Sequence, residues 1–137
     1  MGVAPLANIE NVDVTDVVVV AASGTTGAGR SAKVNLIGSE VMNNLTSYKF
    51  GGVHQHTPEI ELILGKISGK DVKISFTPIL APMPRGILAT VTCKYSGNLT
   101  LQDLRSAFAS KYVEARFVHL LVEGQMPNTA AVFGSIS

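Results

Sequence analysis

The chain has 137 residues, of which 46% are hydrophobic and 15% are charged, and its net charge is +1. That length suits one domain with a hydrophobic core, which we place over residues 1–137. A small net charge without a basic run disfavours nucleic acid and anionic membranes as partners. The most apolar run, VVVVAA at 17–22, is far shorter than the ~20 residues of a membrane-spanning helix. Because average domains carry ~25% charged residues, the low charge indicates that another subunit or domain covers part of the surface.

The N-terminus and the cysteine content bear on the compartment. MGVAPLANIE has neither a basic nor an apolar leader region, so no secretory signal is predicted. The single cysteine, Cys93, excludes an internal disulfide and suits a reducing compartment, so we expect a cytoplasmic protein. Cys93 lies in the middle of a predicted strand without a feature that would lower its pKa, which favours a structural role.

The first third of the chain predicts a strand, a glycine-rich loop and a helix. DVTDVVVVAAS at 13–23 is β-branched and uninterrupted, which is typical of a strand buried on both faces. The loop SGTTGAGRS follows, and apolar residues then recur at helical spacing over 31–45. This apolar stripe consists of Val34, Ile37, Val41 and Leu45.

The middle of the chain predicts a helix, a strand and a rigid turn. Thr57 is expected to cap the helix, with Pro58 at its first position. DVKISFTPIL, which begins at Asp71, predicts a strand that ends at Pro78. The prolines of APMPRG restrict the residues before them, so this segment is expected to be extended or turned.

The last third completes the predicted fold. Residues 87–95 predict a strand, and 98–112 predict an amphipathic helix capped by Thr100. Residues 116–124 and 129–136 are two further strand candidates. This order predicts an α+β domain with a mixed or antiparallel sheet and helices packed on one face. The inward side of the last helix is expected to carry Leu101, Leu104 and Phe108.

The loop from Gly24 to Ser31 has the spacing of a phosphate loop, except that Arg30 replaces the lysine. Arginine has a broad planar guanidinium group, whereas the lysine of a phosphate loop has a compact ammonium group. The chain also lacks repeated βα units. These departures argue against nucleotide hydrolysis. A loop that faces an anion or cofactor remains the favoured interpretation, and a turn without a ligand is the alternative.

Two histidines, His54 and His56, precede the second predicted helix. A metal site needs three or four ligands, and nothing near them completes a set, so no metal is expected. In an acid/base site, Glu59 would orient one of the rings. The alternative, equally supported by the residues, is that both histidines only form hydrogen bonds around the loop. His119 lies in an apolar segment and is expected to be a core histidine.

Arg85 lies in the PMPRG turn, whose two prolines and glycine leave the backbone little freedom. An arginine on a rigid turn is suited to a bidentate grip on a carboxylate or phosphate. A surface arginine beside a turn is the equally supported alternative.

Four segments in this order, SGTTGAGR, GVHQHTPEIE, FTPILAPMPRGILATVT and FVHLLVEGQMPNTAAVFGS, resemble the second domain of N-acetyl-gamma-glutamyl-phosphate reductase. That enzyme is similar to aspartate-semialdehyde dehydrogenase. The resemblance implies a fold like the C-terminal domain of glyceraldehyde-3-phosphate dehydrogenase, an NADPH-binding Rossmann domain elsewhere, and a cysteine that forms a thioester with the substrate.

The resemblance also implies roles for residues of this chain. The H-x-H-T-P-E stretch provides the base, for which His56 is favoured over His54, with Glu59 holding its ring. The P-M-x-R-G turn brings Arg85 and Gly86 to the substrate's carboxylate or phosphate. The glycine-rich loop lies near the nicotinamide of the cofactor NADP, and its residues are Ser23, Gly24, Gly27, Gly29 and Arg30.

Departures from the family pattern limit the expected activity. The nucleophile stretch N-P-G-C-Y-P-T and the G-x-G-x-x-G fingerprint are absent, and Gln55 and Ile79 replace residues that are commonly Arg and His. We therefore expect a substrate-binding and oligomerisation domain, cut from a longer enzyme or encoded as a truncated relative. Alone it should be inactive and should not hold NADP stably, and it should self-associate through its sheet face. The alternatives are a non-enzymatic scaffold and a half-enzyme completed in trans by a Rossmann domain.

Overall fold

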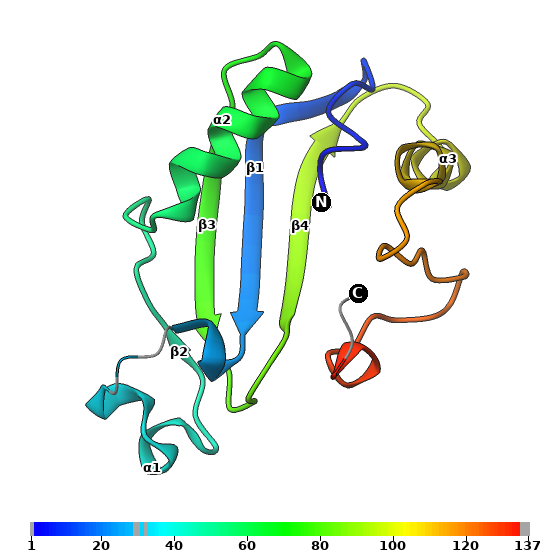
Figure 1. Ribbon diagram of the computed structural model, residues 1–137. Helices are drawn as coiled ribbons and strands as arrows, with labels where there is room; N and C mark the ends of the chain where they lie inside the picture. The colour runs from blue at the N-terminus through cyan, green and yellow to red at the C-terminus, as the bar shows by residue number, and fades with distance from the viewer. Residues whose placement is uncertain (1, 29–30, 32, 135–137) are drawn as a thin grey trace.

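The computed structural model describes residues 2–28, 31 and 33–134, and it contains a mixed sheet with one long helix lying across it (Figure 1). The strand order is β2-β3-β1-β4, with β1 and β3 parallel and the other neighbours antiparallel. The predicted α+β class and mixed sheet are confirmed. The elements are β1 (Val12–Ser23), η1 (Thr25–Ala28), η2 (Val34–Leu36), α1 (Gly38–Val41), β2 (Thr46–Ser47), α2 (His56–Ser68), β3 (Lys73–Leu80), β4 (Ile87–Tyr95), α3 (Leu101–Tyr112) and η3 (Ala130–Val132).

The central strand β1 has one buried and one open face. Val17 and Val19 are buried, whereas Val18 and Val20 between them are 41% and 37% exposed. The predicted strand is therefore confirmed, but its burial on both faces is wrong. Helix α2 and the segment 3–9 pack on the same face of the sheet, and the described residues leave the other face open. The buried core between them consists of Val3, Ala7, Val12, Val14, Val17, Val19, Ala21, Leu64, Val72 and Ile74.

Helix α2 begins two residues earlier than expected. Its N-cap is Gln55, so Thr57 lies inside the first turn and does not cap the helix. The Thr57 hydroxyl is buried without a hydrogen-bond partner among the described residues. The helix ends at Gly69, whose φ of 69° is the left-handed conformation that glycine favours at this position.

Strand β3 continues through Pro78 to Leu80, so the predicted end at Pro78 is wrong. The Pro78 carbonyl accepts the Tyr48 N–H at 3.2 Å, on the side of β2. The missing N–H of Pro78 points to the same side, where the ladder with β2 begins only at Ile79. Proline therefore costs no bond to the central strand, which is why it is tolerated here.

Strand β4 and helix α3 match their predictions. Thr100 caps α3 by a capping box, in which its hydroxyl accepts the Asp103 N–H at 3.2 Å and the Asp103 carboxylate accepts the Thr100 N–H at 2.9 Å. On the predicted inward side, Leu104 and Phe108 are half-buried, but Leu101 is exposed.

Three predicted elements are absent from the described residues. Over 31–45 there are only the short η2 and α1, and of the expected apolar stripe only Val41 is buried. Residues 116–128 form no strand, and the following candidate segment contains only η3 up to Phe133. The C-terminal segment lies beyond β4, apart from the sheet (Figure 1). None of the described helices has the length and apolar character needed to cross a membrane.

Candidate functional site

A cavity of about 890 Å³ lies on the α2 side of the sheet, where the parallel strands β1 and β3 reach their carboxyl ends. Such ends are where open sheets with parallel strands commonly bind ligands. Three segments that are distant in sequence meet in its wall: the glycine-rich loop, the start of α2 and the end of the 82–86 turn. Of the predicted site residues, the cavity is lined by Ser23, Gly24, Gly27, His54, His56 and Gly86.

The glycine-rich loop is bonded to the turn at 82–86. The backbone N–H groups of residues 24–26 donate to carbonyl oxygens of this turn over N···O distances of 2.9 to 3.2 Å. The Gly27 N–H donates to the carbonyl of Gly24 at 3.3 Å. These four successive N–H groups therefore have partners and are not free to cradle a phosphate. Gly29 and Arg30, the other predicted loop residues, lie outside the described residues.

Gly24 is required by the close approach of the two segments. A Cβ atom at this position would lie 2.8 to 2.9 Å from backbone atoms of Arg85. Thr26 adds to the same junction, because its hydroxyl donates to the Pro84 carbonyl at 2.7 Å. The loop thus holds the backbone of the turn in a fixed position.

His54 is a buried residue, with 7% of its surface exposed. Its Nδ1 accepts the His56 N–H at 3.2 Å, and its ring packs edge-on against Phe76 with centroids 4.9 Å apart. Burial lowers the pKa of His54, and the nearby charges of His56 and Lys49 lower it further. The hydrogen-bonding alternative describes this histidine well.

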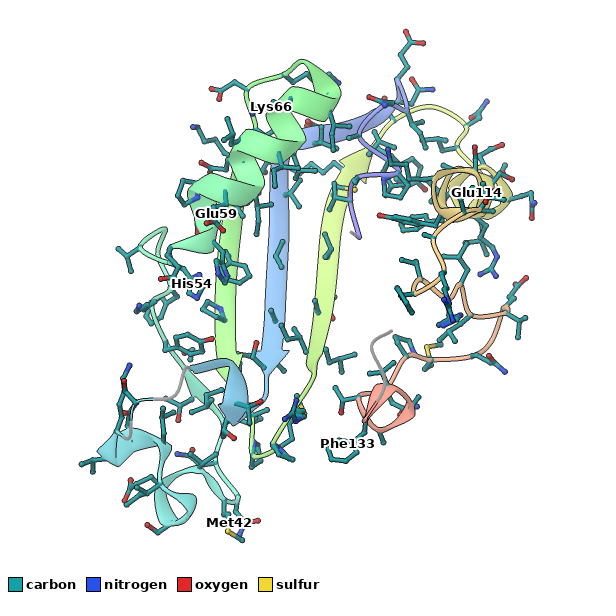
Figure 2. The ribbon with its side chains drawn as sticks, viewed as in Figure 1. Met42, His54, Glu59, Lys66, Glu114 and Phe133 are labelled. Carbon is teal, nitrogen blue, oxygen red and sulfur yellow. The ribbon has the colours of Figure 1, made fainter. Side chains whose placement is uncertain are left out.

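His56 is the first residue of α2, and its side chain is exposed to the cavity. Its ring contacts that of His54 edge-on, with centroids 4.9 Å apart. Glu59 lies in the first turn of the helix and is exposed (Figure 2). Within the described part of the chain, no hydrogen bond or ion pair joins Glu59 to either histidine, so the expected orienting contact is not made in this structure.

Arg85 and Gly86 differ in their relation to the cavity. Gly86 lines the cavity and has a φ of +94°. A Cβ atom added at Gly86 would lie 3.2 Å from the side chain of Thr129. Arg85 is exposed, and its side chain is not part of the cavity wall. Its backbone is fixed by the loop, so its predicted role in gripping an anion stays a prediction.

Sequence reasoning missed two cavity residues in the loop after β2. Lys49 lines the cavity and has a φ of +46°, which is uncommon for a residue with a side chain. No carboxylate in the described ranges pairs with it. Tyr48 also lines the cavity, and its ring lies against His54 with centroids 5.8 Å apart. The glycine pair at 51–52, which ends the loop, was the signal that a tight turn brings these residues to the histidines.

The remaining candidates lie outside the cavity. Cys93 is half-buried on β4 against the core, and burial raises the pKa of its thiol, which agrees with a structural role. His119 is exposed in an irregular segment, so the prediction of a core histidine is wrong. No three His, Cys, Asp or Glu residues of the described chain are grouped as a metal site would require.

Sequence relatives carry one enzyme name. The chain is 55% identical over 137 residues to N-acetyl-gamma-glutamyl-phosphate reductase from Acidothermus cellulolyticus, which covers 100% of this chain and 40% of the relative. It is 59% identical over 120 residues to the same enzyme from Arthrobacter sp. strain FB24. This match covers 88% of the present chain and 35% of the relative. The chain therefore spans well under half the length of these relatives. The resemblance noted in the sequence is confirmed.

Solved structures share the fold at low identity. Aspartate semialdehyde dehydrogenase II from Vibrio cholerae matches with a TM-score of 0.65 and 11% identity, over 93% of this chain and 43% of that one. Aspartate semialdehyde dehydrogenase with NADP from Candida albicans matches with a TM-score of 0.59 and 14% identity, over 95% and 41%. The family model of the semialdehyde dehydrogenase dimerisation domain matches residues 1–137. The chain therefore belongs to the semialdehyde dehydrogenase dimerisation domain family.

Proposed function

We propose that this domain supplies the proton-handling and anion-binding half of an N-acetyl-gamma-glutamyl-phosphate reductase. The observation that carries this proposal is the shared cavity, in which the glycine-rich loop, His56 and Gly86 line one wall. The reductase name of the relatives supports the substrate class. The nucleophilic cysteine and the cofactor domain are expected outside this chain, because Cys93 is half-buried against the core, away from the cavity.

His56 is proposed as the base. When a thiol attacks an acyl phosphate, the sulfur–carbon bond forms, the bond from carbon to the phosphate oxygen breaks, and the thiol proton must be taken up. A ring nitrogen of His56 is the acceptor that this chain offers, since His56 is exposed to the cavity and His54 is buried. Glu59 would act on it only after a change of side-chain conformation or on substrate binding.

The substrate is an anion, and two cations that pair with no carboxylate of the described residues lie in the cavity wall and on the adjoining turn. Lys49 lies in the wall beside the histidines, and Arg85 lies on the turn that ends at Gly86. We propose that these two side chains bind the substrate's carboxylate and phosphate. Lys33 and Glu40, which have opposite charges, also line the cavity.

The residues present fit one end of NADP better than the other. Since the N–H groups of residues 24–27 all have backbone partners, these residues offer no free backbone donor for a pyrophosphate. Its small residues Ser23, Gly24 and Gly27 line the cavity, and they would leave room there for the nicotinamide end of the cofactor. When bound by a cofactor domain, NADPH would supply the hydride. Stable binding of NADP to this chain alone is not expected.

Self-association is proposed to use the open face of the sheet. Successive side chains of a strand point to opposite faces of the sheet. The open face therefore carries Val18, Val20 and the residues that the strand register places beside them on β3 and β4. These neighbours are uncharged and mostly β-branched, and they include Thr77, Ile79, Leu88, Thr90 and Thr92. Charged residues lie only toward one end of this face in the described strands, where Asp16 pairs with Lys94 at 3.3 Å. An uncharged patch of this kind is typical of the centre of a subunit contact.

The test is complementation in trans. The chain is mixed with a cofactor domain from a relative that carries the cysteine, and oxidation of NADPH by N-acetylglutamyl phosphate is followed by absorbance. We expect activity that His56→Ala reduces by at least about a hundredfold, as for loss of a general base. His119→Ala is the matched control, because His119 is exposed away from the cavity.

A titration separates the proposal from a scaffold role. The chain should bind N-acetylglutamate or inorganic phosphate, and Arg85→Ala or Lys49→Gln should weaken that binding. Absence of binding at millimolar ligand, together with absence of activity in the mixture, would contradict the proposal and support a non-enzymatic interaction domain.

A further inference from the structure

We infer that His54 is a positioning residue that caps helix α2 through its imidazole and thereby fixes His56 in the cavity. The two histidines of the H-x-H stretch would then have different tasks, one structural and one chemical. This inference rests on the proposed function for the role of His56, but the capping itself is independent of it.

The capping is carried by two hydrogen bonds. The first N–H groups of a helix have no partner within the helix, and a side chain of Ser, Thr, Asp or Asn at the N-cap usually accepts one of them. Here the N-cap is Gln55, and its side chain makes no capping bond. The His56 N–H donates to Nδ1 of His54 at 3.2 Å, and the Thr57 N–H donates to the His54 carbonyl at 3.0 Å. His54 therefore satisfies both of the first two N–H groups of α2.

The hydrogen bond defines the protonation state of the ring. Nδ1 accepts a hydrogen bond from the backbone N–H of His56, so it carries no proton itself, and the neutral ring must carry its proton on Nε2. Protonation of Nδ1 would place two N–H groups against each other and break the cap. For this reason His54 has no free nitrogen with which to accept a substrate proton.

The surroundings of His54 favour this neutral form. Its ring is enclosed by Phe76 of β3, by His56 of α2 and by Tyr48 of the loop after β2. The charged or titratable groups that face it are His56, Tyr48 and Lys49, of which His56 and Lys49 act with burial to lower the pKa of His54. A positive charge on this ring is therefore disfavoured in the pH range where His56 would work.

The consequence for the site is geometric. His56 is the first helical residue, so the direction of its side chain depends on how the first turn is fixed. The cap holds the backbone at His56, and the edge-on contact between the two rings restricts the ring of His56 as well. A base must lie within hydrogen-bond reach of the proton that it takes, so small displacements are costly.

The experiment begins with nuclear magnetic resonance of the chain itself. Long-range ¹H–¹⁵N spectra over pH 4 to 9 report the tautomer and titration of each histidine. We expect His54 as the neutral tautomer with the proton on Nε2, and a pKa of His54 below the ordinary value of histidine. A His54 ring protonated on Nδ1 at neutral pH would overturn the inference.

Two substitutions separate capping from packing. His54→Phe keeps a ring against Phe76 but accepts no hydrogen bond, whereas His54→Asn can present its side-chain oxygen close to the position of Nδ1. We expect hydrogen exchange of the His56 amide to be about tenfold faster in His54→Phe and largely restored in His54→Asn, as for loss of one hydrogen bond. Equal exchange in the wild type and His54→Phe would overturn the inference. If His54→Phe does not fold, the tautomer of the wild type and the exchange in His54→Asn still decide it.

The activity readout is the mixture with a cofactor domain. A positioning role predicts that His54→Phe lowers kcat about tenfold with little change in KM, and that His54→Asn recovers most of the loss. If the wild-type mixture is inactive, the proposed function fails while the spectra and the exchange rates still test the cap. If His54→Phe retains full kcat in an active mixture, the positioning role is overturned.

Discussion

Gly24 joins two segments that lie about sixty residues apart in the chain. Its N–H donates to the Gly86 carbonyl at 2.9 Å, and its α-carbon lies against the backbone of Arg85. From the phosphate-loop spacing in the sequence, this glycine would be expected to let the backbone approach a ligand. In the structure the close neighbour is the chain's own turn, so the glycine serves the assembly of the cavity wall.

The first prediction concerns Gly24→Ala. A Cβ atom would lie 2.8 to 2.9 Å from the Arg85 backbone, so the loop or the turn must move. We expect the free energy of unfolding to fall by about 1–3 kcal/mol, as for overpacking elsewhere in proteins. Urea denaturation followed by circular dichroism measures this change. Any activity in the complementation assay should fall as well, because the turn that carries Arg85 is displaced.

Gly27→Ala is the matched control. It lies in the same loop, but apart from its two chain neighbours no atom of the described residues lies within 4 Å of the Cβ position. Its effect on stability should stay within about 0.5 kcal/mol, as is usual for surface substitutions away from special features. Equal effects of the two substitutions would contradict the packing explanation.

The residue types in the H-x-H stretch pointed to a site, but not to the division of tasks between the histidines. His54 and His56 are equally polar, and each could serve as a base from sequence alone. Their difference arises from burial beneath the loop after β2 and against Phe76, which are contacts with segments distant in sequence. Local pattern cannot supply such contacts.

At the scale of the element, the apolar stripe over 31–45 shows why helical spacing alone misled. Val34 and Leu45 are 78% and 67% exposed, so most of the stripe has no surface to pack on in the described chain. Most helical stability in proteins comes from such packing. Gly38 adds a cost of ~1 kcal/mol relative to alanine within a helix. Only the four residues of α1 become helical, and they include the buried Val41.

The strand candidate at 116–124 failed for a related reason. Its alternating apolar residues suit a pleated, half-buried surface, but a strand also needs a neighbour to pair with. In the described residues this segment is held instead by α3, through the bond from the Arg105 guanidinium to the Leu121 carbonyl at 2.7 Å. Strands β1 and β4 were predictable because their β-branched runs pair with each other.

Helix α3 had a local signal that needed no distant contact. Thr100 and Asp103 form the capping box that their spacing predicted. Two hydrogen bonds from Thr100 lower the pKa of Asp103, because they favour its ionised carboxylate. Since α3 buries no residue fully, the cap contributes a large share of what holds the helix.

The second prediction is therefore that Thr100→Ala weakens α3 by about 1 kcal/mol. Hydrogen exchange of the α3 amides should become roughly fivefold faster, while the amides of β1 and β3 should change little. Ser110→Ala in the same helix is the control, and because alanine is the better helix former, it should slow exchange or leave it unchanged. Unchanged exchange in Thr100→Ala would mean that the cap does not stabilise the helix.

At the scale of the molecule, the two faces of the sheet differ. Its α2 side holds the core and the cavity, whereas its other side is open and uncharged around Val18 and Val20. The membership of a dimerisation domain family fits this arrangement. The low charge of the sequence predicted a covered surface, but the position of that surface required the strand register.

The last prediction places a charge at the centre of the open face. In a symmetric contact, Val20→Lys would bring two like charges into the interface, and such juxtaposition costs several kcal/mol. We expect the dissociation constant for self-association to rise by about a hundredfold or more. Sedimentation velocity at tens of micromolar should then show a shift from dimer toward monomer.

The matched control is Val113→Lys, because Val113 is an exposed residue at the end of α3, and it should leave the assembly unchanged. Val20 is already 37% exposed and a lysine stem is apolar, so the fold should persist, which circular dichroism would verify. A wild-type chain that stays monomeric at this concentration would contradict the proposed self-association. A Val20→Lys chain that dimerises normally would show that the copies meet on another surface.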